Sequence, residues 1–185
     1  MESMPESPND DRLFAAMCEL NRFSPDSLVS LGYDPRTLGI VIVDHGSRRA
    51  ESNELLLEVV AQFQRITGLP IVEPAHMELA EPSIAQAFAA AVAQGATAVV
   101  VFPYFLAPGR HWRSDIPRLA AAAAAQHPGV KSLVTAPLGL HPLMHAIMQD
   151  RILQCLAHAE HDRERCDVCR HDQDCHWSDS DEPLA

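Results

Sequence analysis

The chain has 185 residues, of which 47% are hydrophobic and 21% are charged. This composition supports a buried core and argues against a wholly disordered chain. A formal net charge of −11 argues against a general nucleic-acid binder, which needs a basic face to displace the counterions of phosphates. No apolar run reaches the length of about 18 residues that a membrane span requires, and the N-terminus lacks the basic and then apolar order of a secretory signal. We therefore expect a cytoplasmic protein with no membrane and no nucleic acid as partner.

The acidic residues are concentrated at the two ends of the chain. Residues 1–38 contain seven acids and three bases, and residues 160–185 contain nine acids and three bases. Residues 39–159 are nearly neutral, with nine acids and eight bases. We therefore expect an N-terminal extension over residues 1–38, one globular domain over residues 39–159, and an acidic tail rich in Cys and His over residues 160–185.

The N-terminal extension carries a weak amphipathic pattern over residues 11–23, which predicts a helix in an otherwise disordered segment. Ser24, Pro25 and Asp26 follow and predict a turn. We assign no chemistry to this part of the chain.

The pattern sharpens at residues 39–43, which form a continuous apolar run rich in β-branched residues. Such a run is typical of a strand that is buried on both faces of a parallel sheet. Residues 51–67 then carry apolar residues at helical spacing, and Gly68 closes the predicted helix.

The same strand, loop and helix unit recurs along the chain. The further expected strands are residues 71–77, 96–103 and 130–136, and the further expected helices are residues 82–94, 115–126 and 141–158. Residues 104–112 form the loop after the third strand. The order βαβαβαβα predicts an α/β fold, a flavodoxin-like doubly wound parallel sheet of about four strands with helices on both faces.

Candidate ligands follow three of these strands. In an open parallel sheet, ligands bind beyond the carboxyl ends of the strands, where the loops converge. His45 follows the first strand, His76 and Glu78 end the second, and His111 lies in the loop after the third. Two histidines and a carboxylate on neighbouring loops form a first shell that suits a divalent transition metal.

Five arginines lie near the loops that contain His45 and His111 and make an anionic ligand reasonable despite the overall negative charge. They are Arg48, Arg49, Arg110, Arg113 and Arg118.

Three other interpretations of these residues stay open. His45, Gly46 and Ser47 precede a predicted helix and could bind a phosphate through backbone N–H groups. Glu78 could interact with the dipole of the helix that follows it. A metal carrier or storage protein could also use His45 and His111 without catalysing any reaction.

Three motifs, taken together, resemble one known family. They are VDHGSR at residues 43–48, MELAEPSI at residues 77–84, and a third motif made of PYFL at 103–106, PGRH at 108–111 and DIP at 115–117. In this order they are similar to the CbiX/SirB family of sirohydrochlorin chelatases, and the resemblance covers about residues 39–158.

The resemblance implies a class II chelatase that inserts Co²⁺ or Fe²⁺ into the tetrapyrrole sirohydrochlorin without ATP, in cobalamin or sirohaem biosynthesis. The metal-binding histidines of the family fall on His45 and His111, and its associated glutamate falls on Glu78. These three residues are the expected metal-binding and catalytic residues, and His76 lies outside the pattern. The chain resembles the short form with a single α/β unit, which implies a homodimer.

The chemistry of metal insertion suits these residues. Two pyrrole N–H protons must leave while the metal arrives, and a neutral imidazole can either bind the metal or accept a proton. Glu78 could do either. Sirohydrochlorin is rich in carboxylates, which the arginine fork binds well, so Arg48, Arg110 and Arg113 are the expected substrate-binding residues. Residues 104–106 could line an apolar wall against the macrocycle.

The C-terminal tail contains a cysteine cluster formed by Cys166, Cys169 and Cys175. Its spacing suits Zn²⁺ or an iron–sulfur cluster, and some sirohaem-forming relatives hold a 2Fe–2S cluster at a similar position. The fourth ligand could be Cys155, His171, His176 or a cysteine across a dimer. The alternative is a flexible acidic tail that collects metal loosely.

Overall fold

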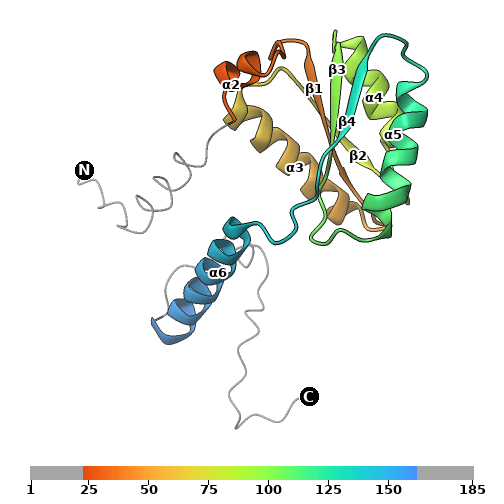
Figure 1. Ribbon diagram of the computed structural model, residues 1–185. Helices are drawn as coiled ribbons and strands as arrows, with labels where there is room; N and C mark the ends of the chain where they lie inside the picture. Colours follow the sequence, from red (N-terminus) through yellow and green to blue (C-terminus); the bar gives the residue numbers. More distant parts are fainter. Residues whose placement is uncertain (1–22, 162–185) are drawn as a thin grey trace, which may run out of the picture. The chain divides into compact units, whose positions relative to one another are not determined.

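The computed structural model of the protein describes residues 23–161 (Figure 1). The chain divides into two compact units, one ending at Gly139 and the other beginning at Leu140. The first unit contains α2 (Pro25–Ser30), β1 (Leu38–Asp44), α3 (Ala50–Thr67), β2 (Ile71–His76), α4 (Ile84–Ala93), β3 (Ala98–Pro103), the short π-helix η1 (His111–Asp115), α5 (Ile116–Ala124) and β4 (Lys131–Val134). The second contains α6 (Pro142–His161). Over residues 23–161, none of the helices combines the length and apolar character of a membrane span.

The four strands form one sheet in the order β2-β1-β3-β4, and every neighbouring pair is parallel. This confirms the expected α/β fold with a parallel sheet of four strands. The register places Asp44 opposite His76 and Val43 opposite Pro103. The carboxyl ends of β1, β2 and β3 therefore lie at the same edge of the sheet.

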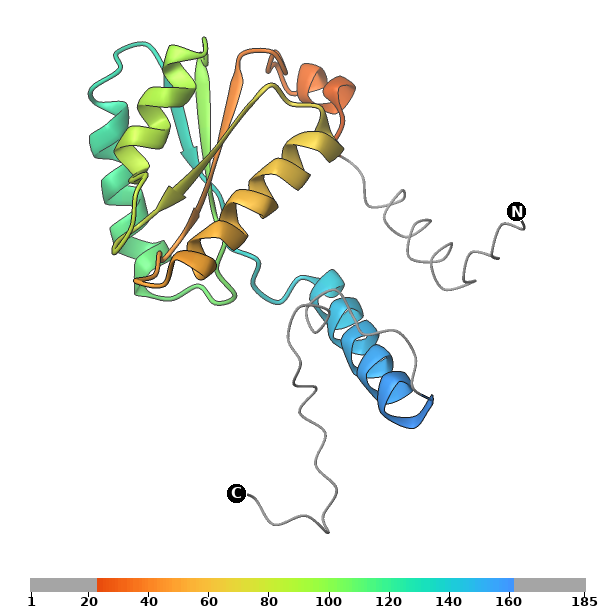
Figure 2. The ribbon, with the colours of Figure 1, turned by 180° about the vertical axis from the view of Figure 1, so that it is seen from behind.

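Helices cover both faces of the sheet, as a doubly wound fold requires (Figures 1 and 2). Successive residues of β1 point to opposite faces. Val41 and Val43 pack in one core cluster with Phe88 of α4, and this cluster also contains residues of α5. Ile40 and Ile42 belong to a second cluster on the other face, together with Leu56 and Val60 of α3. The apolar run at residues 39–43 is thus buried on both sides.

The turn expected at Ser24, Pro25 and Asp26 is instead the start of helix α2. Ser24 is the N-cap, and it forms a reciprocal capping box with Ser27. Proline is favoured in the first turn of a helix because its missing N–H would have no partner there. The turn-forming residues therefore begin a helix, and its Leu28 is buried against the core of the first unit.

The expected domain over residues 39–159 ends with a helix that the structure places in the second unit. At the other end of that range, β1 begins at Leu38 and Leu28 already belongs to the core. The domain boundaries therefore stay a prediction. The helix expected at residues 11–23 lies outside the described residues, apart from Phe23.

Candidate metal centre

Three loops converge at the carboxyl edge of the sheet. The chain runs from β1 to β2 on one side and then returns past β1 to β3, so the direction of winding changes between β1 and β3. Parallel sheets with this strand order bind ligands at that switch point. His45 immediately follows β1, and His111 begins the helical turn after β3. The two expected metal ligands therefore lie on the two sides of the switch point.

The structure brings His45 and His111 together although they are far apart in sequence. Their ring centroids are 5.3 Å apart, and the rings meet edge to face at 66°. Both side chains are half-buried. Two imidazoles at this separation can share a metal ion between them.

Each of the two rings is held through its Nδ1 atom. Nδ1 of His45 lies 3.2 Å from the carbonyl oxygen of Gly46, and Nδ1 of His111 lies 3.0 Å from Oδ2 of Asp115. Both partners accept hydrogen bonds, so Nδ1 carries the proton and Nε2 keeps a free lone pair. Metal-binding histidines are commonly oriented in this way. The arrangement leaves Nε2 of both rings to hold a metal.

His111 does not lie in a loop, which is a difference from the expectation for residues 104–112. It is the first residue of η1, a π-helical turn that continues directly into α5. The backbone N–H of Arg113 bonds to the carbonyl of Gly109, so helical structure begins before the predicted helix. The turn places Asp115 next to His111, and π-helical turns are frequent at functional sites.

A cavity of about 320 Å³ opens beside this turn. Glu78 and Arg110, both expected site residues, line it together with His111. The other lining residues are Met77, Asp115, Arg118 and Leu119. Arg118 was expected near these loops but not among the substrate-binding residues, and its position seven residues after His111 puts it on the same side of the helix.

The expected three-ligand set is brought together only in part. Among residues 23–161, no group of three or more His, Cys, Asp and Glu side chains is close enough to hold a metal. His45 and His111 form the pair, and Glu78 is an exposed residue at the neighbouring cavity. His76 is apart from this pair, because its side chain is only 1% exposed and its Nδ1 lies 2.6 Å from Oδ1 of Asp44.

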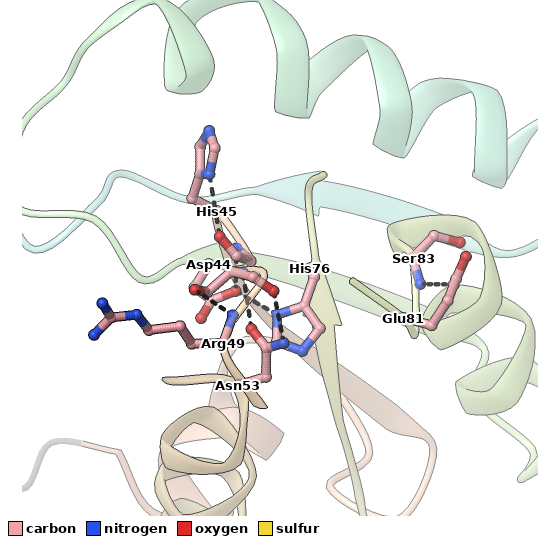
Figure 3. A network of polar contacts seen from close by, with 9 residues as sticks. Asp44, His45, Arg49, Asn53, His76, Glu81 and Ser83 are labelled. Carbon is pink, nitrogen blue, oxygen red and sulfur yellow. Dashed lines mark hydrogen bonds and ion pairs between the residues drawn. The ribbon is translucent and has the colours of Figure 1, made fainter. Parts of the chain in front are cut away.

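The loop after β1 is fixed by Asn53, a residue that the sequence analysis did not single out. The backbone N–H of Ser47 donates to Oδ1 of Asn53 at 2.8 Å, and Nδ2 of Asn53 donates to the carbonyl of Ser47 at 2.9 Å (Figure 3). The N–H of Arg49 donates to the hydroxyl of Ser47. Side chains of the protein thus occupy two backbone N–H groups that a phosphate-binding turn would need.

The remaining expected residues are placed as follows. Arg48 is exposed in the loop after β1, and Arg113 is exposed on η1 but is not among the described residues that line the cavity. Phe105 lies beside His111, with ring centroids 6.3 Å apart. Cys166, Cys169 and Cys175 lie outside the described residues. Cys155 is an exposed free cysteine on α6.

A second and larger cavity, of about 690 Å³, lies between α2 and the turn before β1. In this turn Arg36 donates side-chain and backbone hydrogen bonds to Asp34, which lower the pKa of that carboxyl group to about 2. The turn enters β1 at its amino end, whereas the histidines follow the carboxyl ends. The candidate centre therefore lies beside the smaller cavity, which His111 lines.

Comparisons with known proteins identify the family of the chain. A family model described as CbiX matches residues 39–155. The sirohydrochlorin ferrochelatase of Arabidopsis thaliana, named as chloroplastic, is 58% identical over 137 residues, which cover 74% of this chain and 61% of that protein. The sirohydrochlorin cobaltochelatase of Methanocaldococcus jannaschii is 43% identical over 88 residues, which cover 48% of this chain and 62% of that protein. The chain thus spans less than two thirds of the length of these two curated relatives.

Solved structures share the fold. A CbiX protein from Marinobacter aquaeolei is 31% identical with a TM-score of 0.57, over 64% of this chain and 97% of that one. The chelatase SirB of Bacillus subtilis subspecies spizizenii, solved in complex with cobalt, is 29% identical with a TM-score of 0.60, over 63% of this chain and 50% of that one. Because the family match spans more than half of the residues, this chain belongs to the CbiX family.

Proposed function

We propose that the protein is a chelatase that inserts Fe²⁺ or Co²⁺ into sirohydrochlorin. The observation that carries this proposal is the pair of imidazoles at the switch point, with ring centroids 5.3 Å apart. Each ring is oriented through Nδ1, so both Nε2 atoms are left for a metal. The names of the relatives, sirohydrochlorin ferrochelatase and sirohydrochlorin cobaltochelatase, support the same substrate.

In this proposal His45 and His111 receive the divalent metal and present it to the macrocycle. One metal ion replaces two pyrrole N–H protons, so the charge of the tetrapyrrole core stays balanced. Glu78 is exposed at the cavity beside His111 and is the proposed acceptor of one proton. The imidazole that releases the metal regains a basic nitrogen, which can take the other.

Arginines bind the carboxylates of the substrate in this proposal. Arg110 and Arg118 line the cavity with Glu78, whereas Arg48 is exposed in the loop after β1 and Arg113 is exposed on η1. A guanidinium group matches a carboxylate with two parallel hydrogen bonds. Phe105, beside His111, offers an apolar surface to the face of the macrocycle.

The relatives divide between iron and cobalt in their names, and the 58% identity with a protein named as a ferrochelatase makes Fe²⁺ the first metal to test. Imidazole binds both metals, so the two histidines alone do not determine whether Fe²⁺ or Co²⁺ is the substrate.

An anaerobic spectrophotometric assay with sirohydrochlorin tests the proposal. We expect the wild-type protein to accelerate insertion of Fe²⁺ or Co²⁺ over the protein-free rate, and His45→Ala and His111→Ala to abolish the acceleration. His141→Ala, at an exposed histidine just before α6, is the matched control and should keep the wild-type rate. A folded protein that binds metal through both histidines without accelerating insertion would be a carrier instead.

We further propose that the protein forms a homodimer. In support, the described part of α6 exposes large apolar side chains, namely Ile147, Met148, Ile152, Leu153 and Leu156. Exposed apolar groups of this kind favour association. Light scattering should give a molar mass of about twice the 20.3 kDa of one chain, and a monomer at micromolar concentration would contradict the proposal.

Two sequence-based predictions remain for experiment. Spectroscopy of anaerobically purified protein, with and without Cys166→Ser, tests whether the cysteine cluster holds a 2Fe–2S cluster or Zn²⁺. A cytoplasmic location is tested by cell fractionation, with the plastid as the alternative, because the Arabidopsis relative is named as chloroplastic.

A further inference from the structure

A buried pair of side chains lies directly beneath the loop that carries His45. Asp44 and His76 end the neighbouring strands β1 and β2 and are register partners, so their side chains point to the same face of the sheet. Oδ1 of Asp44 lies 2.6 Å from Nδ1 of His76, whose side chain is only 1% exposed (Figure 3). The proposed mechanism uses neither residue.

One oxygen atom of Asp44 serves two donors. Oδ1 also accepts the backbone N–H of Gly46 at 2.9 Å. An ionised carboxylate only accepts hydrogen bonds, so Nδ1 of His76 is the donor in the other contact. Gly46 immediately follows His45, so the carboxylate that His76 orients holds the turn on which His45 stands.

The same turn is joined to the turn that carries Glu78. The N–H of Met77 donates to the carbonyl of Asp44 at 2.9 Å, and the N–H of Glu78 donates to the carbonyl of His45 at 3.1 Å. A Cβ atom on Gly46 would lie 2.1 Å from the carbonyl oxygen of Glu78. The two turns are therefore in close contact at Gly46, and hydrogen bonds join them on both sides of His45.

We infer that His76 is a positioning residue, which acts through Asp44 and Gly46 to hold the His45 ring in place against His111. This inference rests on the proposed function, because it concerns the geometry of the same metal-binding pair. Because the His76 ring is buried, it would touch neither the metal nor the macrocycle. In Figure 3 the His45 ring points away from the contact between Asp44 and His76, so the influence passes through the backbone turn.

Two substitutions of His76 distinguish a positioning role from a contribution to core packing. His76→Leu removes the donor but keeps an apolar side chain of similar bulk, and His76→Asn returns an N–H donor near the position of Nδ1. We expect His76→Leu to lower the affinity for Co²⁺ alone, and the insertion rate, about 10–100-fold, as for other residues that orient metal ligands. His76→Asn should recover most of this loss. The KM for sirohydrochlorin should stay unchanged, since no contact with the macrocycle is removed.

Phe88→Leu is the matched control, because Phe88 is fully buried on the opposite face of the sheet. This variant should lose stability in thermal unfolding and yet keep the wild-type affinity for Co²⁺. If it loses as much affinity as His76→Leu, the effect is general destabilisation and the inference is wrong.

Asp44→Ala tests the same inference independently, and it can still be measured if His76→Leu does not fold. It should weaken Co²⁺ binding at least as much as His76→Leu does, because it removes the acceptor of both donors. Adding His76→Leu to Asp44→Ala should change the affinity by no more than about twofold, since both act through one contact. If only Asp44→Ala folds, wild-type affinity for Co²⁺ in that variant contradicts the inference. If the double variant also folds, a loss of affinity equal to the product of the two single losses contradicts it as well.

The failure of this inference is distinguishable from the failure of the proposed function. A wild-type protein that neither binds nor inserts Co²⁺ or Fe²⁺ overturns both. A wild-type protein that inserts metal, beside a folded His76→Leu variant of equal affinity and rate, overturns the positioning role alone.

Discussion

Oδ2 of Asp115 lies 3.0 Å from Nδ1 of His111, four residues earlier on the same helical turn. The carboxylate holds the ring and accepts the proton of Nδ1, so that the lone pair is left on Nε2. His45 has only the carbonyl of its neighbour Gly46 at Nδ1. The two histidines of the pair are therefore oriented by different groups, a charged carboxylate at His111 and a backbone carbonyl at His45.

Substitution of Asp115 should weaken the centre without removing a ligand. We expect Asp115→Ala to lower Co²⁺ affinity and the insertion rate about 10–100-fold, because metal-binding histidines depend on such partners. Asp115→Asn keeps an oxygen acceptor and should lose less. Titration with Co²⁺ and the insertion assay measure both effects.

Asp150→Ala is the matched control for Asp115. Its carboxylate also bonds a side chain four residues away on a helix, Gln154, but it lies on α6. Unchanged Co²⁺ affinity in Asp150→Ala is expected. Equal losses in the two variants would mean that the Asp115 effect is not specific to His111.

Gly46 should tolerate no side chain. Its φ is +80°, and an added Cβ would lie 2.1 Å from the carbonyl oxygen of Glu78. Backbone strain alone costs about 1–3 kcal/mol, and the clash must also separate the His45 and Glu78 turns. Gly46→Ala should therefore lower both the free energy of unfolding and the insertion rate.

Gly68→Ala is the control that separates backbone strain from the steric clash at Gly46. Gly68 has a similar φ of +69°, but nothing lies within 4 Å of an added Cβ. Urea unfolding should show a smaller loss for Gly68→Ala, with the wild-type insertion rate. If the two alanine variants are equally active, close packing of the two turns is not important for the reaction.

The sheet and the meeting of the two histidines could be predicted from the sequence, because both follow from short-range patterns. The apolar run of β1 is buried on both faces, as continuous β-branched runs are in parallel sheets. His45 and His111 follow strands that became neighbours, so a parallel arrangement was sufficient to bring them to one edge.

Features that depend on side-chain register could not be predicted in the same way. The contact between Asp44 and His76 requires those two residues to pair across β1 and β2, and Asn53 reaches the loop only once α3 is oriented. The helical turn at His111 was missed because Gly109 and the preceding Pro108 favour a loop locally. That turn is also what brings Arg118 to the cavity.

The loop after β1 should depend on Asn53. Two hydrogen bonds join Asn53 to the backbone of Ser47, and each contributes about 0.5–1.5 kcal/mol. Asn53→Ala should lower the free energy of unfolding by about 1–3 kcal/mol and reduce the insertion rate. Gln64→Ala, which removes an exposed bond to the carbonyl of Pro70, should change neither quantity appreciably. An Asn53→Ala protein with wild-type stability and rate would show that the loop is held by its other contacts.

Arg118 should contribute to substrate binding rather than to metal binding. It lines the cavity with Arg110 but is not part of the histidine pair. A hydrogen bond to a charged group contributes about 1.5–3 kcal/mol, so Arg118→Gln should raise the KM for sirohydrochlorin about tenfold or more. The affinity for Co²⁺ alone should not fall. Added salt should raise the wild-type KM, because salt screens exposed charges.

Arg65→Gln, in the last turn of α3, is the charge-matched control and should leave the KM unchanged. Arg113→Gln distinguishes the cavity from the surrounding loop, since Arg113 is exposed on the same turn but does not line the cavity with Arg118. A larger effect of Arg118→Gln than of Arg113→Gln would place a substrate carboxylate in the cavity. A larger effect of Arg113→Gln would place that carboxylate over the outer surface of the turn. The role of the cavity would then be limited to proton transfer, with Glu78 as the acceptor.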